Sequence, residues 1–375
     1  MAHCILVTGG AGFIGTHIVE RLLEKGNEII IFDDLNRQVH SSHKRPSSIE
    51  CKDSLHFIQA DIRSKTLLKE AVLACDSIIH LAGMVGVGQS MYEVERYVDI
   101  NSRGTACLLD LLANEEHSVK KLVVASSVTV YGEGTYKCPK CEKEYHPNIR
   151  SKKNLEKGIW DHLCPFCGDA LIGRPTNENS LLKPLSLYGI TKKHQEEMSL
   201  LLGRTYGIPT VALRFFNVFG PGQTLSNPYA GVVALFLSRI MNNQQPLVFE
   251  DGEQTRDFVY VKDVVEANMI ALQTSACDFD VFNVGSGTPT SIFNVANTIS
   301  RLCNKDVQPL VTYQRRVGDV RHCFADITKM KRAGFRAHYQ LEDGLKETLQ
   351  WGLNETPRDF SSKSIEDLKT HNLIT

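Results

Sequence analysis

One stretch near the N-terminus decides the fold of this chain: Ile5-Leu6-Val7-Thr8-Gly9-Gly10-Ala11-Gly12-Phe13-Ile14-Gly15. Its start predicts a short buried strand, and the turn that follows leads into a helix whose apolar face includes Ile18 and Leu22. Glycines in such a turn let the backbone bend sharply and approach a pyrophosphate, which helix N–H groups and the helix dipole then hold. We predict a phosphate-binding turn, although strand-to-helix turns also use glycine for geometry alone. Its expected contacts are Gly9, Gly12, Phe13, Ile14 and Gly15.

An acidic residue ends the next predicted strand. There the carboxylate of Asp33 can accept hydrogen bonds from the adenosine ribose hydroxyls and repel a 2′-phosphate. The sequence therefore predicts NAD as a cofactor in preference to NADP, with a simple strand-end cap as the alternative for Asp33. Asp61 and Ile62 follow the third predicted strand and either line the adenine or form an ordinary turn.

Short runs of branched residues alternate with amphipathic stretches, which is typical of a parallel sheet covered by helices. We predict an α/β protein with a doubly wound Rossmann-type parallel sheet, a smaller α/β substrate lobe and an inserted segment. Strands are expected at 5–8, 28–32, 56–59, 77–81, 121–125 and 209–215, and helices at 12–25, 65–74, 101–115 and 188–206. The expected domains are a cofactor-binding domain at 1–132 and 177–215, an insertion at 133–176, a second lobe mainly at 216–354 and a polar, loosely held tail at 355–375.

The composition excludes several classes of partner. A formal net charge of −1 leaves no excess of charge to attract nucleic acid or an anionic membrane. No apolar run approaches the roughly 20 residues that a membrane helix needs, and the first residues do not resemble a secretory signal. Seven of the 11 cysteines are scattered through apolar or helical stretches, as buried free thiols are. We therefore expect a soluble protein of the reducing cytoplasm.

The other cysteines form two Cys-x-x-Cys pairs in the insertion, Cys138-Pro-Lys-Cys141 and Cys164-Pro-Phe-Cys167. Two such turns can supply four thiolates to one tetrahedral zinc ion, and a polar segment with almost no core needs such a staple. We predict a structural zinc held by Cys138, Cys141, Cys164 and Cys167, with two disulfides or a redox pair as alternatives. The insertion must stand near the substrate entrance, as a lid, an oligomer contact or a partner dock.

A phenol and an ammonium stand four residues apart in Tyr188-Gly-Ile-Thr-Lys192, so they share one face of a helix. A nearby ammonium favours the phenolate and lowers the pKa of a tyrosine from about 10, which would make Tyr188 a general base. A surface pair is the alternative. The predicted strand 121–125 runs into Ser126, Ser127 and Thr129 at the sheet edge where doubly wound folds bind ligands, so Ser127 or Thr129 can hydrogen-bond the reacting oxygen.

These motifs together resemble the extended short-chain dehydrogenase/reductases, the NAD-dependent nucleotide-sugar epimerase/dehydratase family. The resemblance covers nearly all of the chain outside the insertion. It rests on the glycine turn, Asp33, His80-Leu81-Ala82-Gly83, Asn101, Ser126-Ser127-Val128-Thr129-Val130-Tyr131-Gly132, Tyr188 to Lys192 and Arg214-Phe-Phe-Asn217-Val-Phe-Gly-Pro221.

The resemblance implies a role for each of these residues. Tyr188 would take the proton, Lys192 would hold the nicotinamide ribose and tune Tyr188, and Ser127 would orient the sugar oxygen. It also implies cofactor contacts from Leu81, Ala82, Gly83, Asn101 and Ser126. Val85 stands where some epimerases have a lysine near the cofactor phosphates, which puts the tightness of NAD binding in question.

The resemblance also narrows the reaction. Similar dehydratases have Thr-Asp-Glu where this chain has Ser127-Val128-Thr129, and similar decarboxylases have Glu in place of Thr129. A 4-epimerase that passes through a transient 4-keto sugar is the leading interpretation. The alternatives are a dehydratase, decarboxylase or reductase of the family, or a non-catalytic NAD-sensing protein that docks a partner through its zinc knuckle.

The resemblance also implies that the second lobe binds the nucleotide sugar. Asn217, Val232, Arg256, Arg316 and Asp319 match positions that contact the diphosphate or nucleotide in similar epimerases, and arginine suits phosphate by its forked donors. Surface ion pairs are the alternative for Arg256 and Arg316. The run 223–232 resembles epimerases of UDP-hexoses or of dTDP-6-deoxyhexoses such as dTDP-rhamnose. Cys323 falls where some members have a bulky aromatic, so it either widens the sugar pocket or is simply buried. A homodimer through helices near Asn101 and Tyr188 is also implied.

Overall fold

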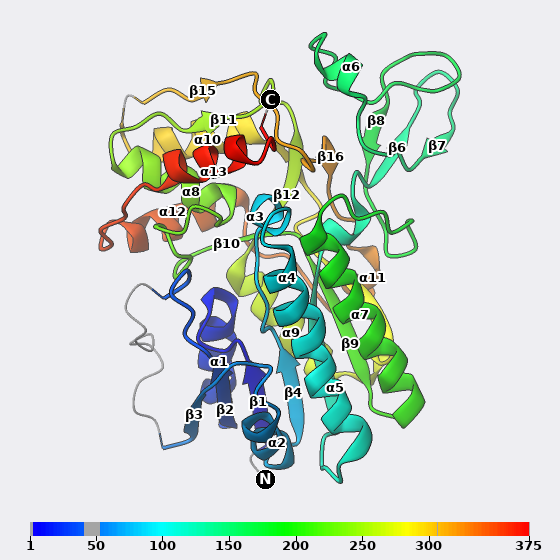
Figure 1. Ribbon diagram of the computed structural model, residues 1–375, viewed down its shortest axis with the longest axis vertical. Coiled ribbons are helices and arrows are strands. Elements are labelled where there is room, and N and C mark those ends of the chain that lie inside the picture. Colours follow the sequence, from blue (N-terminus) through cyan, green and yellow to red (C-terminus); the bar gives the residue numbers. More distant parts are fainter. Residues whose placement is uncertain (1–2, 41–52, 306, 375) are drawn as a thin grey trace.

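The computed structural model describes residues 3–40, 53–305 and 307–374 (Figure 1). Cys51, one of the cysteines expected to be a free thiol, lies outside these ranges. The centre of the protein is a parallel seven-stranded sheet with the strand order β13-β9-β5-β4-β1-β2-β3. Its strands are β1 (Cys4–Thr8), β2 (Glu28–Asp33), β3 (Leu55–Gln59), β4 (Ser77–His80), β5 (Lys121–Ser127), β9 (Thr210–Phe215) and β13 (Asp280–Val284).

Alternate side chains of the strands build two cores, one on each face of the sheet. Ile5 and Val7 of β1 join the core beneath α1 (Phe13–Glu24) and α9 (Val261–Gln273). Leu6, between them, points to the opposite core, which is closed by α2 (Lys65–Leu73), α5 (Gly104–Asn114) and part of α7 (Leu187–Tyr206). Burial of both faces explains why these strands read as nearly continuous apolar runs.

The sheet confirms the predicted doubly wound fold and extends it. The predicted strands all occur with small shifts at their ends, and the predicted helix at 101–115 is preceded by a π-helical turn, η2 (Val98–Arg103). Residues 280–284, which we assigned to the second lobe, form β13 and pair with β9. Phe282 and Val284 are almost fully buried there, so the strand gains more by completing the sheet than by staying in the lobe.

The second lobe lies beyond the carboxyl ends of the strands (Figure 1). Its core joins three helices, α8 (Val232–Met241), α10 (Ile292–Leu302) and α12 (Leu341–Gly352), to strand β12 (Thr255–Tyr260), where the ring of Tyr260 is fully buried. Its strands are β10 (Asn217–Phe219), β11 (Leu247–Val248), β12 (Thr255–Tyr260), β14 (Pro289–Ser291), β15 (Leu310–Val311) and β16 (His322–Cys323). Two further helices, η4 (Ser275–Cys277) and α11 (Thr328–Arg332), belong to the sheet domain, because Cys277 and Met330 are buried in the core beneath α1 and α9.

The insertion forms a small unit that projects from the top right of Figure 1. Its three strands, β6 (Thr135–Lys137), β7 (Glu144–Tyr145) and β8 (Ile172–Arg174), pair antiparallel in the order β7-β6-β8, and α6 (Lys152–Leu155) caps it. Its core contains only four buried apolar side chains, those of Tyr136, Cys138, Cys164 and Leu171. So small a core is too weak to fold a segment of this length by itself.

The tail is not loosely held, contrary to our expectation. It forms α13 (Ser361–Thr370), in which Leu368 is buried and packs against Gly88 of α3 (Val87–Ser90). The N–H of Val317 donates to the carbonyl of Leu373 at 2.8 Å, so the chain end is also tied to the second lobe. The helix is amphipathic, and its few apolar residues suffice because they lie on one face.

The remaining short helices are α4 (Val94–Tyr97) and the 3-10 turn η3 (Val128–Tyr131). In the described part of the chain, no helix has both the length and the apolar content to cross a membrane.

Candidate active site

A cavity of about 630 Å³ opens between the carboxyl edge of the sheet and the second lobe. Its volume is in the range usual for cofactor and substrate sites. All of the predicted cofactor, catalytic and substrate residues except Asn101 line it: Gly9, Gly12, Phe13, Ile14, Gly15, Asp33, Asp61, Ile62, Leu81, Ala82, Gly83, Ser126, Ser127, Thr129, Tyr188, Lys192, Asn217, Val232, Arg256, Arg316 and Asp319. Residues from both lobes therefore meet in one place.

The glycine turn at the cavity wall has the geometry that an anion site needs. Gly9 has a φ of +70°, and a Cβ there would lie 2.8 Å from the backbone nitrogen of Ala82. A Cβ on Gly15 would lie 2.4 Å from the carbonyl oxygen of Gly9. Helix α1 begins at Phe13, and its N-cap residue, Gly12, has no side chain to cap it, so the helix dipole and first N–H groups are left for an anion. These features fit the pyrophosphate of a dinucleotide.

Asp33 ends β2 beside this turn. Its Oδ2 accepts the N–H of Ala11 at 3.0 Å and its Oδ1 accepts the N–H of Leu35 at 2.9 Å. Burial raises the pKa of Asp33, and these hydrogen bonds together with the charge of His40 offset that only in part. The carboxylate thus braces the turn and still faces the cavity where an adenosine ribose would lie.

Replacing Asp33 by Asn should lower the affinity for NADH about tenfold and reduce the preference over NADPH, because the charge that repels a 2′-phosphate is lost. Fluorescence titration with each dinucleotide measures both effects. Asp76→Asn is the matched control, since Asp76 also accepts a backbone N–H, that of Cys4 at 3.1 Å, but precedes β4 at the opposite edge of the sheet. Equal NADH affinity in the two variants would remove the role of Asp33.

Asn101 lies behind the cavity wall and does not line the cavity. Its Oδ1 accepts the N–H of Met84 at 2.7 Å, and its Nδ2 donates to the carbonyl of Met84 at 3.1 Å and to Thr191 Oγ1 at 2.9 Å. It therefore fastens the segment after β4 to α7. Asn101 thus makes a positioning contact, and its contact with the cofactor stays a prediction.

The side chain of Tyr188 is buried at the start of α7, where the hydroxyl of Ser186 caps the helix by accepting the N–H of Gly189. Its ring meets Tyr97 edge to face, with 6.4 Å between centroids. Burial raises the pKa of Tyr188 to about 12, and a hydrogen bond with Ser127 lowers it only in part. Thr129 Oγ1 donates to Ser127 Oγ at 3.0 Å, which links the three hydroxyl groups that the sequence singled out.

Lys192 does not act on Tyr188 as we expected. Its Nζ donates to Gln195 Oε1 at 2.9 Å, and burial lowers the pKa of Lys192 to about 8. No charge effect of Lys192 contributes to the shift of Tyr188, which burial dominates. The expectation that the ammonium lowers the pKa of this phenol is therefore wrong for the protein without ligands. Gln195, one helical turn beyond Lys192, was missed because an amide is not a catalytic signal.

If Tyr188 acts as a phenolate and Lys192 as an ammonium, log kcat/KM should rise with pH up to about 8 and then level off. Below pH 8 only the phenolate fraction changes, and it rises about tenfold per pH unit because the pKa of Tyr188 lies far above. Above pH 8 the loss of the ammonium cancels that gain. A profile between about pH 6 and about pH 10 measures this.

The Lys192→Met variant has no ammonium to lose, so its lower rate should continue to rise above pH 8. A plateau at the same pH in this variant would show that another group sets it.

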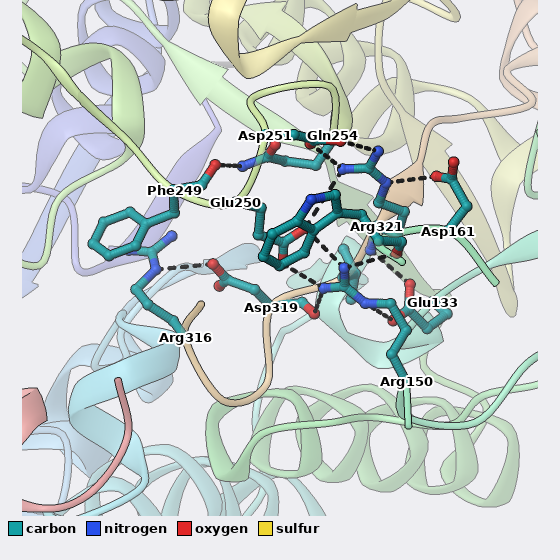
Figure 2. A network of polar contacts seen from close by, with 12 residues as sticks. Glu133, Arg150, Asp161, Phe249, Glu250, Asp251, Gln254, Arg316, Asp319 and Arg321 are labelled. Atoms are coloured by element: carbon teal, nitrogen blue, oxygen red, sulfur yellow. Dashed lines mark hydrogen bonds and ion pairs between the residues drawn. The ribbon is translucent and has the colours of Figure 1, made fainter. Parts of the chain in front are cut away.

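The second lobe brings cationic groups to the far side of the cavity. The guanidinium of Arg256 donates to the carbonyls of Thr255, Val320 and Arg321, and within the described ranges no carboxylate neutralises it. Arg316 lies over the ring of Phe249, 4.6 Å from its centroid, and its Nε donates to Asp319 Oδ2 at 2.8 Å (Figure 2). Both arginines are suited to an anion such as a diphosphate.

Two buried amide oxygens in the cavity lining point to a polar ligand. Asn217 Oδ1 and Gln223 Oε1 have no hydrogen-bond partner in the part of the chain that the structure describes. A buried acceptor without a partner costs about 1–3 kcal/mol, so a donor from a bound molecule would stabilise the site.

Several lining residues were not anticipated. Phe249, Tyr229 and Leu368 face the cavity, and Leu368 comes from the tail. Tyr229 is held by hydrogen bonds with Tyr92 Oη at 2.7 Å and Asp367 Oδ2 at 2.8 Å. Their positions depend on contacts between distant segments, so no local pattern marks them.

The four cysteines of the insertion come together as predicted. Their sulfur atoms all lie within 4.8 Å of one another, with 3.5 Å between Cys138 and Cys167 and 3.9 Å between Cys141 and Cys164. A tetrahedral zinc with bonds of about 2.3 Å places its sulfurs about 3.8 Å apart. All four are free thiols, and the donor set fits zinc. Cys323 is also a free thiol, and complete burial raises its pKa to about 12.

Comparison with known proteins agrees with this geometry. The NAD dependent epimerase/dehydratase family model matches residues 5–153 and 166–285. The dTDP-L-rhamnose 4-epimerase of Burkholderia thailandensis is 35% identical over 363 residues, which cover 94% of this chain and 96% of that protein.

Two solved structures are also similar. The UDP-glucose 4-epimerase of Thermotoga maritima with UDP-glucose is 31% identical, with a TM-score of 0.75 over 93% of this chain and 98% of that one. The UDP-glucose 4-epimerase of Thermus thermophilus in complex with NAD is 26% identical, with a TM-score of 0.73 over 94% and 100%. The glycine turn, the buried tyrosine and these similarities lead to one conclusion, that the chain belongs to the NAD dependent epimerase/dehydratase family.

Proposed function

We propose that this protein is an NAD-dependent nucleotide-sugar 4-epimerase. The observation that carries the proposal is that the buried phenol of Tyr188 shares one cavity with Ser127 and with an uncapped helix start at the glycine turn. A dinucleotide held by the turn can thus meet a sugar beside the phenol. The named 4-epimerases among its relatives support the same reaction.

Each group in the cavity then has a chemical task. NAD held at Gly9, Gly12 and Gly15 would supply reversible hydride transfer at the sugar carbon. Tyr188 removes the proton of the 4-hydroxyl as the ketone forms and returns it when the ketone is reduced. Ser127, itself oriented by the hydroxyl of Thr129, holds the reacting oxygen. Lys192, with its lowered pKa, holds the nicotinamide ribose.

The other lobe would hold the nucleotide diphosphate. Arg256 and Arg316 bring positive charge, and Asn217 offers an acceptor that has no partner among the described residues. Val232 and Asp319 complete the predicted contacts from the cavity wall. The substrate we propose is a UDP-hexose or a dTDP-6-deoxyhexose such as dTDP-rhamnose, in agreement with the named relatives. Cys323 leaves room beside the sugar because its side chain is small.

We also propose a structural zinc at Cys138, Cys141, Cys164 and Cys167, because the thiol spacing suits a closed tetrahedral site. A homodimer through α5 and α7 is supported by apolar side chains that remain exposed there, such as Leu201 and, on η2, Val98. We place the protein in the cytoplasm because its described cysteines are free thiols.

The test of this function is to incubate the protein with UDP-, dTDP-, GDP- and CDP-sugars and to follow the sugar carbons by NMR. Formation of a C4 epimer without net consumption of NAD supports the proposal. A stable keto sugar, carbon dioxide or stoichiometric NADH would instead indicate a dehydratase, decarboxylase or reductase. Absence of any turnover despite NAD binding would favour a non-catalytic NAD sensor that docks a partner through the insertion.

A further inference from the structure

The insertion reaches the substrate side of the cavity through a buried cluster of charges. Arg150 of the insertion forms a forked pair with Glu250 of the second lobe, at 2.7 Å from Nη1 to Oε2 and 2.6 Å from Nη2 to Oε1 (Figure 2). Only 6% of the Arg150 side chain and 1% of the Glu250 side chain are exposed. A forked arginine–carboxylate pair fixes distance and orientation together.

The same guanidinium also holds a second segment of the lobe. Arg150 Nη2 donates to the main-chain carbonyl of Asp319 at 3.0 Å, and Nη1 donates to the carbonyl of Trp160 at 3.1 Å. The pair with Glu250 and the bond to Asp319 therefore join two segments that are far apart in the sequence. Arg321 strengthens the junction, since it forms a second forked pair, with Asp251, and bonds Asp161 of the insertion.

These two segments carry the wall that faces the substrate. Phe249 directly precedes Glu250. The guanidinium of Arg316 lies over the ring of Phe249, and Nε of Arg316 donates to Asp319 Oδ2 (Figure 2). Phe249, Arg316 and Asp319 all line the cavity. Arg150 does not line the cavity. It bonds the side chain of Glu250 and the main chain of Asp319, directly behind the residues that do.

The backbone conformation of Glu250 indicates that its pair with Arg150 is part of the structure of the second lobe. Glu250 has a φ of +53°, a left-handed conformation that is unfavourable for a residue other than glycine. Its N–H donates to the carbonyl of Gln314 at 2.8 Å, and its carbonyl accepts the N–H of Tyr313 at 3.1 Å. Such a conformation persists only where the surroundings determine it, and the forked pair with Arg150 is part of those surroundings.

We propose that Arg150 of the insertion is a positioning residue for the nucleotide-sugar site, holding Phe249 and Arg316 where they meet the nucleotide diphosphate. The inference rests on the proposed function and deepens it, because it gives the insertion a task in substrate binding. Within the described part of the chain, the polar partners of Arg150 include neither Tyr188 nor a residue of the glycine turn, so its loss should weaken nucleotide binding with little effect on proton transfer or on dinucleotide binding.

The test compares wild type with Arg150→Met by calorimetric titration with UDP and dTDP, by fluorescence titration with NADH and by steady-state kinetics. We expect the Kd of the nucleotide and KM to rise about tenfold, while kcat and the Kd of NADH stay within about twofold. Arg150→Lys keeps the charge and loses the forked pair, so it should show much of the same rise in the nucleotide Kd and in KM. It replaces Arg150→Met in this test if that variant does not fold.

Two further variants separate positioning from general damage. Glu250→Gln should also weaken nucleotide binding, and the double variant should be little worse than either single one because both remove the same contact. Lys183→Met is the matched control, since Lys183 Nζ also grips the insertion, at the carbonyl of His146, without contacting the two segments of the wall. It should bind nucleotide as wild type does.

The outcomes are distinct. Nucleotide binding within twofold of wild type in Arg150→Met would overturn the inference and leave the proposed function intact. Equal weakening of nucleotide and NADH binding would also overturn it, because the role would then be general stability. If wild type bound neither UDP nor dTDP, the proposed function would fail and the inference with it.

Discussion

Replacing Tyr188 by Phe is expected to lower kcat for epimerisation about 1000-fold, the usual range for loss of a general acid–base group. The phenol oxygen is the only atom removed, and the ring still packs edge to face on Tyr97. Ser127 keeps its hydrogen bond from Thr129, so the site keeps its shape. We therefore expect the Kd values of NADH and of UDP or dTDP to stay within about twofold of wild type, which rapid quench assays and titrations will measure.

Tyr97→Phe provides the matched control. Its hydroxyl is also buried and donates to Gln89 Oε1 at 3.1 Å, but Tyr97 does not line the cavity. Its removal should cost about 1 kcal/mol of unfolding free energy and leave kcat nearly unchanged. Sugar turnover within tenfold of wild type in Tyr188→Phe would mean that another group moves the proton.

Replacing Cys138 and Cys167 together by Ser is expected to eliminate bound zinc and to unfold the insertion. Binding of zinc by four thiolates contributes on the order of 10 kcal/mol, and the small apolar core of the insertion has no comparable reserve. Elemental analysis of the purified chain should give about one zinc per wild-type chain and none in the variant. Limited proteolysis should then cut within 133–176 while the parallel sheet stays intact.

The loss of zinc should also reach the substrate site. Arg150 and Asp161 would no longer be held against the second lobe, so nucleotide affinity should fall at least as far as in Arg150→Met. Cys303→Ser is the control because Cys303 is a free thiol of the second lobe outside the cluster. Wild-type protein without metal, or with Cys138 in a disulfide by mass spectrometry, would contradict the zinc assignment.

The pH profile and the metal test address different parts of the molecule, so their results are independent. The pH plateau depends on the burial of Lys192 deep in the sheet domain. The metal test depends on the projecting insertion. If the pH profile agrees with the prediction but no zinc is found, the proposed chemistry stands and only the structural zinc is rejected.

The sequence by itself determined the sheet and its cofactor edge. Residues 5–15 carry this information locally, because branched residues favour a strand and only glycine tolerates the close contacts at Gly9 and Gly15. The carboxyl ends of parallel strands share one edge, so Asp33, Ser127 and the loop after β4 could be placed together without coordinates. The two Cys-x-x-Cys turns were equally local.

Only the tertiary structure decided what depends on contacts between distant segments. The strand β13 joined the sheet from residues assigned to the second lobe, and the tail folded into α13 against Gly88. The pKa of Tyr188 rose where the spacing to Lys192 predicted a fall, because burial, which is a property of packing, dominates the shift. The pairing of Arg150 with Glu250 spans 100 residues. The partner of a charged side chain in a polar insertion cannot be predicted from the local sequence, because only the fold brings the two residues together.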